Sequence, residues 1–372
     1  MLSSQIHKRV NFNFDKQKLV FDTSQELFSF AKVDDGTKEL LNSLRKNQKL
    51  NYEKILDLGC GYGIMGIFLK NKFKDSEVLC TDRDSLAVEF TNHNAELNSV
   101  KVEAIPSLDF QEIKAKFSLI LTNFPAKLEK EGLEYFIVKS SEYLEKDGTL
   151  ALVIVKELNI FIEEILKNEE ILVTFKDRNK NYSVYHLQFN EKIKTEVKPY
   201  SQNEISFKIE ENNYTLVTSN ALQEFDTPHF ITALIIEKIL EPKFSFYNRI
   251  FILSPGQGFI PLAVAHSCSR GKIILVSRDL LQLKISSENL KLNAVSSFEN
   301  INLDFPQSKG DLIIWSLRDE SVKEILEKII VFRKNFKKII LGGRIQIINR
   351  ILQNLKIESK KEIRGKYCVI EL

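Results

Sequence analysis

Short apolar runs alternate with longer amphipathic stretches along most of the chain. In the first half the runs cover residues 54–58, 77–82, 101–105 and 117–122, and each has the length of a buried strand. The stretches between them place apolar residues at helical spacing. Strands that alternate with helices predict an α/β fold, with a largely parallel sheet covered by helices on both faces.

A different pattern precedes this alternation in each half. Residues 10–21 and 205–217 predict a β-hairpin, and the second hairpin turns around Glu211, Asn212 and Asn213. A helix is expected after each hairpin, over residues 36–46 and 229–240. Each half is therefore expected to begin with the same hairpin and helix before its sheet starts.

The two halves of the chain repeat each other. A shift of 195 positions aligns them without a gap from about residue 10 to residue 100, at polar as well as apolar positions. Identical pairs include Ile55 and Ile250, Gly61 and Gly256, Gly63 and Gly258, Asp84 and Asp279, Asn94 and Asn289, and Asn98 and Asn293. A repeat of this length indicates a duplicated domain. We expect domains at residues 1–195 and 200–372, joined by a polar linker over residues 192–202.

Composition and charge limit the class of protein. A length of 372 residues is comfortable for two domains, and 43% hydrophobic with 28% charged residues is typical of a soluble globular protein. No apolar run has the length of a membrane span, and residues 1–9 lack the apolar core of a secretion signal. The formal charge of +3 permits a basic face for nucleic acid without indicating one.

The cysteines indicate a reducing compartment. Cys60, Cys80, Cys268 and Cys368 have no paired spacing. We interpret all four as reduced thiols of a cytoplasmic protein, and we expect neither a zinc site nor another metal site.

Candidate chemistry begins at residues 54–66, which read Lys-Ile-Leu-Asp-Leu-Gly-Cys-Gly-Tyr-Gly-Ile-Met-Gly. A short apolar strand carries Asp57 near its end, and a glycine-rich turn follows it. Glycines lack Cβ atoms, so backbone amides can approach a bound cofactor closely. The next apolar run ends in Asp82, where an acid of an α/β sheet commonly holds ribose hydroxyls. The order G-C-G-Y-G departs from the G-x-G-x-x-G of a nicotinamide site.

This combination resembles the class I S-adenosylmethionine-dependent methyltransferases. The resemblance implies two tandem Rossmann-like domains with mainly parallel sheets, and S-adenosyl-L-methionine as the cofactor of the first domain. It also implies that Asp57 and the glycines form the first cofactor motif. The residues expected to bind the cofactor are Asp57, Gly59, Cys60, Gly61, Gly63, Asp82, Arg83, Ser107, Leu108, Asn123 and Thr37. A structural glycine turn in another α/β protein is the alternative interpretation.

The apolar run at 117–122 is followed by Asn123, Phe124, Pro125, Ala126 and Lys127. Amino-group methyltransferases carry Asn-Pro-Pro-aromatic at this place. An exocyclic amine conjugated to a ring is a weak nucleophile, so an Asn oxygen and a backbone carbonyl accept its hydrogens and direct its nitrogen at the methyl group. Proline fixes the backbone that carries this carbonyl. We expect Asn123, Phe124 and Pro125 to be catalytic; the alternative is that Asn123 only caps a turn.

Two positions depart from that tetrapeptide. Phe124 replaces the first proline, and Ala126 replaces the aromatic residue on which a substrate base would stack. Stacking must then use another ring, either Phe124 itself or Phe28. The departures motivate one alternative function, a scaffold that senses the cofactor or binds RNA without turnover. A second alternative is methylation of a protein glutamine or of a DNA amino group, because related Asn-Pro motifs serve both.

Residues 27–37 narrow the resemblance. Phe-Ser followed by Asp34, Gly36 and Thr37 resembles the Phe-Ser…Asp-x-Gly-Thr/Ser signature of the small-domain methyltransferases that act on guanine N2 of ribosomal RNA. Residues 183–186 are similar to that family's C-terminal run. The resemblance implies ribosomal RNA, or a ribosomal subunit, as the partner. One feature differs: in well-known bacterial members the degenerate copy comes first, whereas here it comes second.

The second half has lost the cofactor chemistry. The replacements are Asp57 by Ile252, Gly59 by Ser254, Gly66 by Pro261 and Asp82 by Ser277. The loop acid and the ribose acid are both gone, which removes two polar anchors of the cofactor. We therefore expect the second domain to be a degenerate methyltransferase-like domain that does not bind S-adenosylmethionine and serves structure or substrate recognition.

Contacts to a folded RNA would lie around the acceptor end of the site, where its base must be unpaired or flipped. Lys127 and Lys156 follow strands at the carboxyl edge of the sheet, where ligands bind in open α/β folds. We expect these lysines and Phe28 to contact the substrate. Basic segments at 176–180, 333–338 and 360–366 are further candidates for phosphate contacts, with solvated helix ends and loops as the alternative. No membrane partner is expected.

Overall fold

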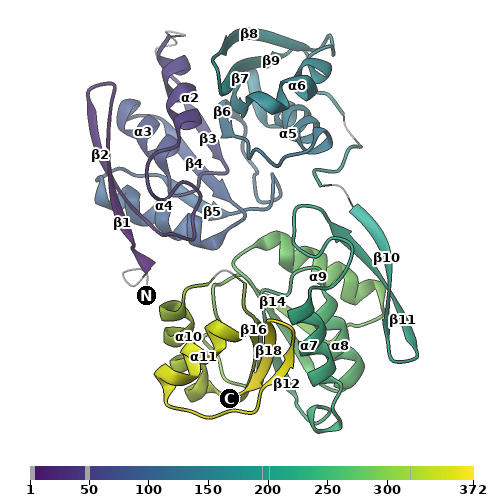
Figure 1. The fold of residues 1–372 in the computed structure, drawn as a ribbon. Helices are drawn as coiled ribbons and strands as arrows, with labels where there is room; N and C mark the ends of the chain where they lie inside the picture. Colours follow the sequence, from purple (N-terminus) through teal and green to yellow (C-terminus); the bar gives the residue numbers. More distant parts are fainter. Residues whose placement is uncertain (1–4, 47–50, 195, 201, 319) are drawn as a thin grey trace. The chain divides into compact units, whose positions relative to one another are not determined.

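The structure is a computed structural model that describes residues 5–46, 51–194, 196–200, 202–318 and 320–372. It divides into two compact units, Met1–Ser201 and Gln202–Leu372 (Figure 1). The linker expected at residues 192–202 includes positions 195 and 201, which lie outside the described residues, as do the first four residues of the segment 1–9.

The first unit is built on a seven-stranded sheet in the order β5-β4-β3-β6-β7-β9-β8. Its strands are β3 (Lys54–Leu58), β4 (Glu77–Asp82), β5 (Glu103–Pro106), β6 (Phe117–Asn123), β7 (Leu144–Val155), β8 (Ile171–Arg178) and β9 (Tyr182–Phe189). Strands β3 to β7 pair in parallel, and β8 and β9 are antiparallel. The α/β prediction is confirmed. The strand order reverses between β3 and β6, so their carboxyl ends flank the switch point at which such sheets bind ligands.

Helices cover both faces of this sheet. They are α2 (Asp35–Lys46), α3 (Ile64–Lys72), α4 (Ser85–Leu97), α5 (Lys130–Tyr143), α6 (Asn159–Ile165) and the short 3-10 helix η1 (Lys156–Leu158). Residues of α2, α3 and α4 share one buried cluster, and residues of α5 and α6 share the other. Neighbouring strand residues alternate between the clusters, Ile55 in the first and Leu56 in the second. Within the part of the chain that the structure describes, no helix is both long and apolar enough to cross a membrane.

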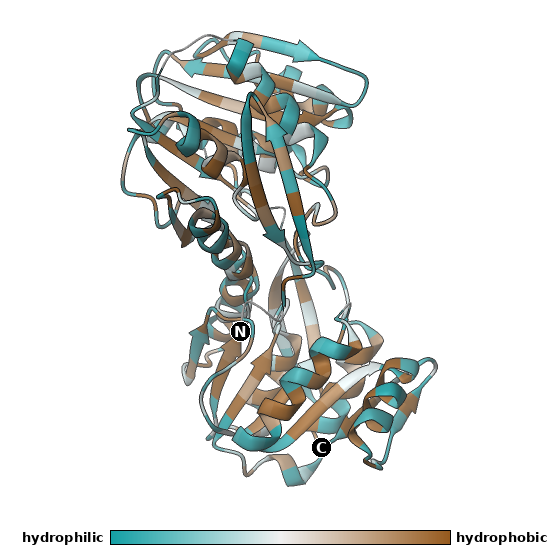
Figure 2. Cartoon of the chain, turned by 90° about the vertical axis from the view of Figure 1, so that its left-hand side faces the viewer, coloured by the Kyte–Doolittle hydropathy of each residue, from teal (hydrophilic) through white to brown (hydrophobic). Residues whose placement is uncertain are grey.

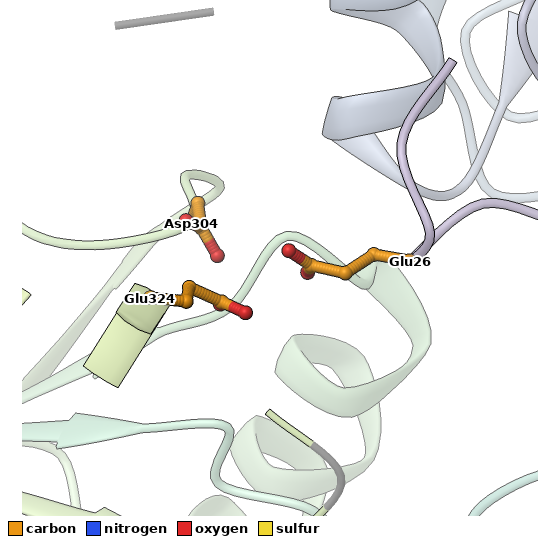
Figure 3. Close-up of side chains that lie close together, drawn as sticks. All are labelled: Glu26, Asp304 and Glu324. Atoms are coloured by element: carbon orange, nitrogen blue, oxygen red, sulfur yellow. The ribbon is translucent and has the colours of Figure 1, made fainter. Parts of the chain in front are cut away.

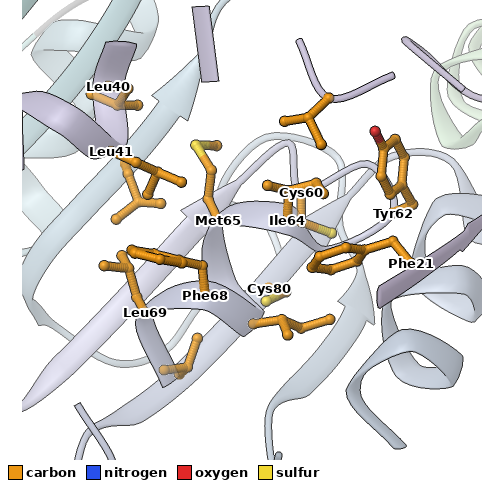
Figure 4. Close-up of a cluster of buried hydrophobic side chains, with 14 of the residues drawn as sticks. Phe21, Leu40, Leu41, Cys60, Tyr62, Ile64, Met65, Phe68, Leu69 and Cys80 are labelled. Atoms are coloured by element: carbon orange, nitrogen blue, oxygen red, sulfur yellow. The ribbon is translucent and has the colours of Figure 1, made fainter. Parts of the chain in front are cut away.

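The cluster beneath α2 and α3 is filled by large side chains, among them Phe21, Leu40, Met65 and Phe68 (Figure 4). Burial of one such side chain contributes about 1.5–3 kcal/mol. The strands of both sheets are mainly hydrophobic in Figure 2. All four cysteines are buried and free, and two of them, Cys60 and Cys80, belong to this cluster.

The expected hairpin precedes the sheet as β1 (Lys8–Phe14) and β2 (Gln17–Thr23). It forms a separate two-stranded sheet, and two asparagines, Asn94 in α4 and Asn98 just after this helix, bind its edge. The Asn94 side chain accepts the Asp22 N–H (2.8 Å) and donates to the Asp22 carbonyl (3.0 Å). The Asn98 side chain does the same with Val20 (2.9 and 2.7 Å). Side-chain amides thus replace a missing strand along this edge.

The second unit repeats the architecture, with the sheet order β14-β13-β12-β15-β16-β18-β17. Its elements are β10 (Gln202–Ile209), β11 (Asn212–Ser219), α7 (Phe230–Ile239), η2 (Pro242–Phe244), β12 (Arg249–Leu253), α8 (Phe259–Ser267), β13 (Lys272–Val276), α9 (Leu280–Leu292), β14 (Phe298–Ile301), β15 (Gly310–Ser316), α10 (Val322–Asn335), β16 (Phe336–Arg344), α11 (Ile345–Leu355), β17 (Glu362–Arg364) and β18 (Tyr367–Glu371). Asn289 and Asn293 bind its hairpin through Val217 N–H (2.7 Å) and Thr215 N–H (3.1 Å). The asparagines that are identical in the two halves therefore make the same contact between helix and hairpin in each unit.

A buried lysine of helix α10 in the second unit pairs with two carboxylates. Of the carboxylates drawn in Figure 3, Asp304 and Glu324 belong to this unit, and Lys328 pairs with both, at 2.8 and 2.7 Å. Burial lowers the pKa of Lys328, but the two carboxylates raise it above its ordinary value overall. The ammonium group also lies 5.4 Å from the centre of the Trp315 ring, which is buried in the core.

Candidate active site

The glycine-rich turn lies at the carboxyl end of β3. Gly59, Gly61 and Gly63 have φ angles of 78°, 57° and 92°, a region that side-chain-bearing residues rarely adopt. A Cβ at Gly59 or Gly61 would meet no described atom within 4 Å, so the turn has an open side. The N–H groups of Gly59 and Cys60 donate to the Thr81 carbonyl of β4 (2.8 and 2.9 Å). The turn is thus fastened to the sheet while its backbone faces open space, as a cofactor loop requires.

Asp57 lies fully buried beneath this turn. Its Oδ2 accepts the Gly66 N–H at 2.7 Å, which joins β3 to the first turn of α3. Burial raises the pKa of Asp57 to about 7; the Gly66 bond opposes this shift and Asp82 adds to it. Its Oδ1 has no hydrogen-bond partner among the described residues and fits a donor that a ligand or water would bring. A Cβ at Gly66 would lie 2.3 Å from the Cys80 sulfur, so the helix approaches the sheet only because this residue is glycine.

Asp82 ends β4 beside the turn. Its Oδ2 accepts the Gly61 N–H and its Oδ1 accepts the Asp84 N–H, both at 3.0 Å. The side chain is half-buried. Ser107 and Leu108, expected at the adenine, lie buried just after β5, and the Ser107 N–H donates to the Asp82 carbonyl at 2.9 Å. The structure thus brings the turn, Asp82 and the loop after β5 to one edge of the sheet.

Two of the expected cofactor residues have structural partners as well. The Cys60 side chain is buried, and its sulfur lies 3.4 Å from the Thr91 hydroxyl, which itself donates to the Gly61 carbonyl (2.9 Å). Cys60 therefore shapes the turn from below. Arg83 is half-buried, and its guanidinium lies 6.0 Å from the centre of the Tyr200 ring.

Tyr200 is a site residue that the sequence did not single out. Its hydroxyl donates to Asp109 Oδ1 at 2.8 Å and so binds the loop that follows β5. Burial, together with Asp109, raises the pKa of Tyr200 well above its ordinary value, which keeps the hydroxyl protonated. The preceding residue packs on the same unit, because a Cβ at Gly132 would lie 2.7 Å from the Pro199 carbonyl. An aromatic residue beside proline in a polar linker was the available signal.

The acceptor end is built around Asn123, the last residue of β6. Its Nδ2 donates to Asp34 Oδ2 (2.8 Å) and to the Thr37 hydroxyl (3.1 Å). The same Asp34 oxygen accepts the Thr37 N–H at 3.0 Å. A Cβ at Gly36 would lie 2.9 Å from both this oxygen and the Tyr182 ring. The Asp-x-Gly-Thr motif is therefore the support of Asn123, and Asp34 is its central group.

This support fixes which way the Asn123 amide points. A carboxylate accepts hydrogen bonds and donates none, so the amide nitrogen must face Asp34. The carbonyl oxygen of the amide is then directed away, and no hydrogen bond to it is formed by the described residues. An amide held in this way presents an acceptor to an incoming amine.

The two candidate stacking rings differ in exposure. Phe124 is 5% exposed and packs on Phe136, with ring centres 5.7 Å apart. Phe28 is 73% exposed on the loop between β2 and α2. In this structure a base can reach Phe28, while Phe124 contributes its backbone, whose N–H donates to the Val153 carbonyl at 3.1 Å. Pro125 is exposed just after it.

The two candidate substrate lysines lie at one edge. Lys127 follows β6, Lys156 follows β7, and both are exposed. Because β6 and β7 are parallel neighbours, their carboxyl ends lie at the same edge of the sheet as the glycine turn. The structure thus brings both lysines to the edge that holds Asn123.

The second unit keeps the shape of the turn and changes its contacts. Ser254, Gly256 and Gly258 have φ angles of 50°, 59° and 98°, close to those of the first turn. The Gly256 N–H is accepted by Gln282 Oε1 (3.3 Å), in place of the aspartate of the first unit. The buried Gln257 side chain binds both backbone groups of Ser219 (2.9 and 2.8 Å). The side-chain amides of Gln282 and Gln257 thus bind backbone groups of this turn and of the neighbouring Ser219.

The acceptor end of the second unit is also occupied by its own side chains. Strand pairing places Ser316 at the position of Asn123 and Arg318 at that of Pro125. The Arg318 guanidinium bonds to Glu224 and to the Thr232 hydroxyl (3.0 Å), the counterpart of Thr37. The Thr232 hydroxyl donates to Glu224 as well (2.7 Å). An ion pair therefore stands where the first unit holds an oriented amide.

Comparison with known proteins supports this description. A family model for the methyltransferase small domain matches residues 18–186. The uncharacterized protein YbxB of Bacillus subtilis is 33% identical over 150 residues, which are 40% of this chain and 74% of that protein. The ribosomal RNA small subunit methyltransferase C of Pseudoalteromonas atlantica is 32% identical over 163 residues. That match covers 43% of this chain and 46% of that enzyme, so the aligned region spans about half of it.

One solved structure matches nearly the whole chain. It is a T. thermophilus 16S rRNA N2 methyltransferase (RsmC), solved in complex with AdoMet and guanosine. The match has a TM-score of 0.73, covers 99% of this chain and 98% of that one, and has 15% sequence identity, which shows a shared two-unit fold. With the family model and the relative in B. subtilis, the chain belongs to the small-domain methyltransferases, within the class I S-adenosylmethionine-dependent methyltransferases.

Proposed function

We propose that this protein transfers a methyl group from S-adenosyl-L-methionine to the N2 amine of a guanine in ribosomal RNA. The observation that carries the proposal is the oriented amide of Asn123, whose nitrogen is bound by Asp34 and Thr37. Its carbonyl oxygen is left as an acceptor, and an aromatic amine bound at this point offers the hydrogens to match it.

The donor would be held at the turn and the two neighbouring loops. Asp82 would receive the ribose hydroxyls, and the loop of Ser107 and Leu108 would contact the adenine. The backbone of the turn at Gly59 to Gly63 would lie against the donor, while Asp57 supports this turn from below through Gly66. The sulfonium of the bound donor supplies an electrophilic methyl group. All these residues lie at the carboxyl edge of the sheet, beside its switch point.

At the acceptor end the chain orients an amine rather than deprotonating it. Asn123 Oδ1 would accept one N–H of the amine, and a backbone carbonyl next to Pro125 would accept the other. The nitrogen lone pair would then face the methyl carbon. An N–C bond would form as the S–C bond breaks, the demethylated thioether would leave, and the cationic amine would pass its proton to water. Orientation and fixed dipoles account for the acceleration in this scheme.

The choice of RNA rests on the surroundings of this edge and on the relatives. Phe28 offers an exposed ring for base stacking, and Lys127 and Lys156 offer cations for phosphates. Relatives are named ribosomal RNA small subunit methyltransferase C, and the matching solved structure contains guanosine. The second unit would then recognise substrate or support the fold without binding donor.

The proposal is tested by transfer of tritiated methyl groups from the donor. The acceptors are 16S rRNA and small subunits from a strain lacking this protein, with DNA and total protein alongside. We expect label in RNA only, and nuclease digestion should release it as N2-methylguanosine. Label in DNA or protein would move the activity to those substrates, and donor binding without transfer to any of them would support the scaffold instead.

Two variants test the role given to Asn123. Asn123→Ala should lower turnover by about 10²–10³-fold, because one oriented acceptor is lost. Asp34→Asn should also lower turnover, since an amide at position 34 lets the Asn123 amide turn either way. Asn92→Ala, on the exposed face of α4, is the matched control and should be silent. Full turnover of Asn123→Ala would remove the role assigned to this residue.

A further inference from the structure

The carboxyl edge of the second unit carries an aromatic pair, of which one ring is exposed and the other is largely covered. Strand β16 ends at Arg344, which pairs with Tyr367 at the start of β18. The Tyr367 ring stacks with that of Phe230, the first residue of α7, at 6.2 Å between centres and 17° between planes. Tyr367 is 9% exposed and Phe230 is 60% exposed. One face of the Phe230 ring thus covers Tyr367, and the ring is otherwise largely open to solvent.

Two cationic residues lie beside Tyr367. The Lys366 ammonium lies 5.5 Å from the centre of the Tyr367 ring, and Arg344 stands opposite Tyr367 in the strand pair. Both are exposed, and neither forms an ion pair with a carboxylate of the described residues. The nearby acids are engaged: Glu224 by Arg318, and Glu237 by Arg364. Burial lowers the pKa of His229, and the charges of Arg318, Lys366 and Arg344 lower it further. Only the charge of Glu224 acts in the opposite direction. The local charge is therefore positive.

Folding of the unit does not account for Phe230. A ring placed for the core would be buried, and the corresponding residue of the first unit, Asp35, is a charged one paired with Lys32 and Lys38. Catalysis does not account for the ring either, because Arg318, Glu224 and Thr232 occupy the acceptor position. The edge that serves the acceptor in the first unit has thus acquired a ring and unpaired cations in the second.

We propose that this edge of the second unit, formed by Phe230, Tyr367, Arg344 and Lys366, binds an unpaired nucleotide of RNA. The base stacks on the open part of the Phe230 ring, and its flanking phosphates lie against Arg344 and Lys366. Stacking on an aromatic ring beside cations is the usual means of holding single-stranded RNA. A protein partner would be expected to complement an apolar surface with carboxylates, and it is an outcome of the test. The choice of RNA rests on the substrate proposed for the first unit.

The test uses the full-length protein without donor and a short, unpaired, fluorescein-labelled oligoribonucleotide, with affinity measured by anisotropy. Phe230→Ala should weaken binding about tenfold, the effect of removing one stacked base. Phe230→Trp should retain the affinity, and Phe230→Leu should lose it, because a flat ring is needed rather than an apolar side chain. Phe246→Ala is the matched control, since that ring is 82% exposed in the same unit, and it should be silent. Arg344→Gln should reduce the slope of log affinity against log salt by about 0.7.

The outcomes separate this proposal from the proposed activity. The proposed nucleotide site at Phe230 would be overturned by unchanged RNA affinity of Phe230→Ala, by an equal loss of affinity in Phe246→Ala, or by full affinity of Phe230→Leu. Each result would count even if the protein methylates RNA. The last of these results would favour a protein partner on an apolar surface. Conversely, if no RNA is methylated but Phe230→Ala and Arg344→Gln still lose RNA affinity, the nucleotide site at Phe230 is supported and the proposed activity is not. Thermal unfolding should be unchanged in every variant, since the three substituted side chains, Phe230, Phe246 and Arg344, are exposed.

Discussion

The two units share a backbone and differ in how their polar groups are satisfied. In the first, Asp82 accepts the Gly61 N–H of the turn, and Asn123 is held by its amide nitrogen so that the described residues form no hydrogen bond to its carbonyl oxygen. In the second, Gln282 accepts the matching Gly256 N–H from a different position of the chain, and Arg318 forms an ion pair with Glu224 where the first unit holds the amide. Ser254 still holds the left-handed φ of Gly59. The turn therefore persists without the chemistry that explains it, which shows that the fold and the site are held by different residues.

One pair of positions shows how the chemistry was lost without loss of the fold. Asp57 accepts the Gly66 N–H deep in the first unit. The second unit has Ile252 and Pro261 at these positions, so the acceptor and the donor are both absent. A buried N–H without an acceptor costs about 1–3 kcal/mol, and a buried carboxylate without a donor costs more. Removing both together avoids either cost.

The largest loss of stability is expected when the carboxylate is restored in the second unit without its N–H donor. Ile252→Asp would bury a carboxylate opposite Pro261, which has no N–H to donate. The second unit should lose about 3–5 kcal/mol of its free energy of unfolding, the cost of an unpaired buried charge. Trp315 is the single tryptophan and lies in β15, so its fluorescence reports the unfolding of this unit in denaturant.

The matched change in the first unit is Asp57→Ile, which leaves the Gly66 N–H without an acceptor. Its smaller cost, about 1–3 kcal/mol, should appear in circular dichroism and leave the Trp315 transition in place. Equal unfolding midpoints for Ile252→Asp and the unaltered protein would show that the second unit still supplies a donor there, against the paired-loss argument.

A second difference between the units concerns a buried contact behind the sheet. In the first unit the Ser43 hydroxyl lies 2.8 Å from His186 Nε2, and burial lowers the pKa of His186 to about 4. In the second unit Lys238 and Glu371 hold these positions as an ion pair at 2.8 Å. A neutral pair in the first unit and a charged pair in the second thus occupy equivalent positions, and their contributions to stability depend on pH differently.

The pH dependence follows from the sign of each shift. Between pH 6.5 and about 4 the unfolded chain protonates His186 while the folded unit does not, so stability falls as pH falls, by about 3 kcal/mol in total. Burial raises the pKa of Glu371, but Lys238 and Lys243 lower it overall, so the stability from this group is lost only at lower pH. His186→Gln should remove this loss from the first unit and leave the Trp315 transition unchanged.

The measurement is the difference between His186→Gln and the unaltered protein in circular dichroism melts from pH 7 to pH 4. Asp57 titrates in the opposite sense, because its pKa is raised to about 7, and its contribution cancels in this difference. A difference that does not grow as the pH falls would mean that His186 is protonated in the folded unit.

Periodicity and glycine spacing predicted most of the fold. The alternation of strands and helices and the hairpins are local patterns, the duplication is a repeat visible in the sequence, and each of them appears in the structure. The repeat marked Asn94 and Asn98 as special without a reason, because their partners lie 72 and 78 positions away on the hairpin. The residues around Asn123 came from the motif, but its orientation depends on Asp34, 89 positions earlier.

Contacts that join distant residues were beyond sequence reasoning. Nothing local in the second half indicates that Arg318 meets Glu224, 94 positions away. Exposure was equally hidden: Phe124 and Phe28 were equivalent candidates for stacking until burial separated them. The same holds for Tyr200, which meets Asp109 across 91 positions. Such contacts depend on how the helices, strands and loops pack together, and they cannot be predicted from composition or from the spacing of residues.

Tyr200 provides the last and smallest prediction. In the second unit the loop after β14 is fastened by its own Asn302, which donates to the Ser277 and Arg278 carbonyls (3.0 and 2.9 Å). In the first unit the loop after β5 is instead bound from the linker by the Tyr200 hydroxyl. Tyr200→Phe removes one hydrogen bond to a carboxylate and should free the loop after β5, for which we propose contact with the adenine. Donor affinity should then weaken about fivefold, or about 1 kcal/mol.

Titration calorimetry with S-adenosylmethionine measures this effect, with Tyr214→Phe as the matched control. The Tyr214 hydroxyl makes a bond of the same length, 2.8 Å, to His266 in the second unit, which has no donor site in our proposal. Tyr214→Phe should leave donor affinity unchanged. Equal weakening by both substitutions would mean that the second unit takes part in donor binding, and this would contradict the division of roles between the two units. Loss in Tyr200→Phe alone would assign the linker to the donor site.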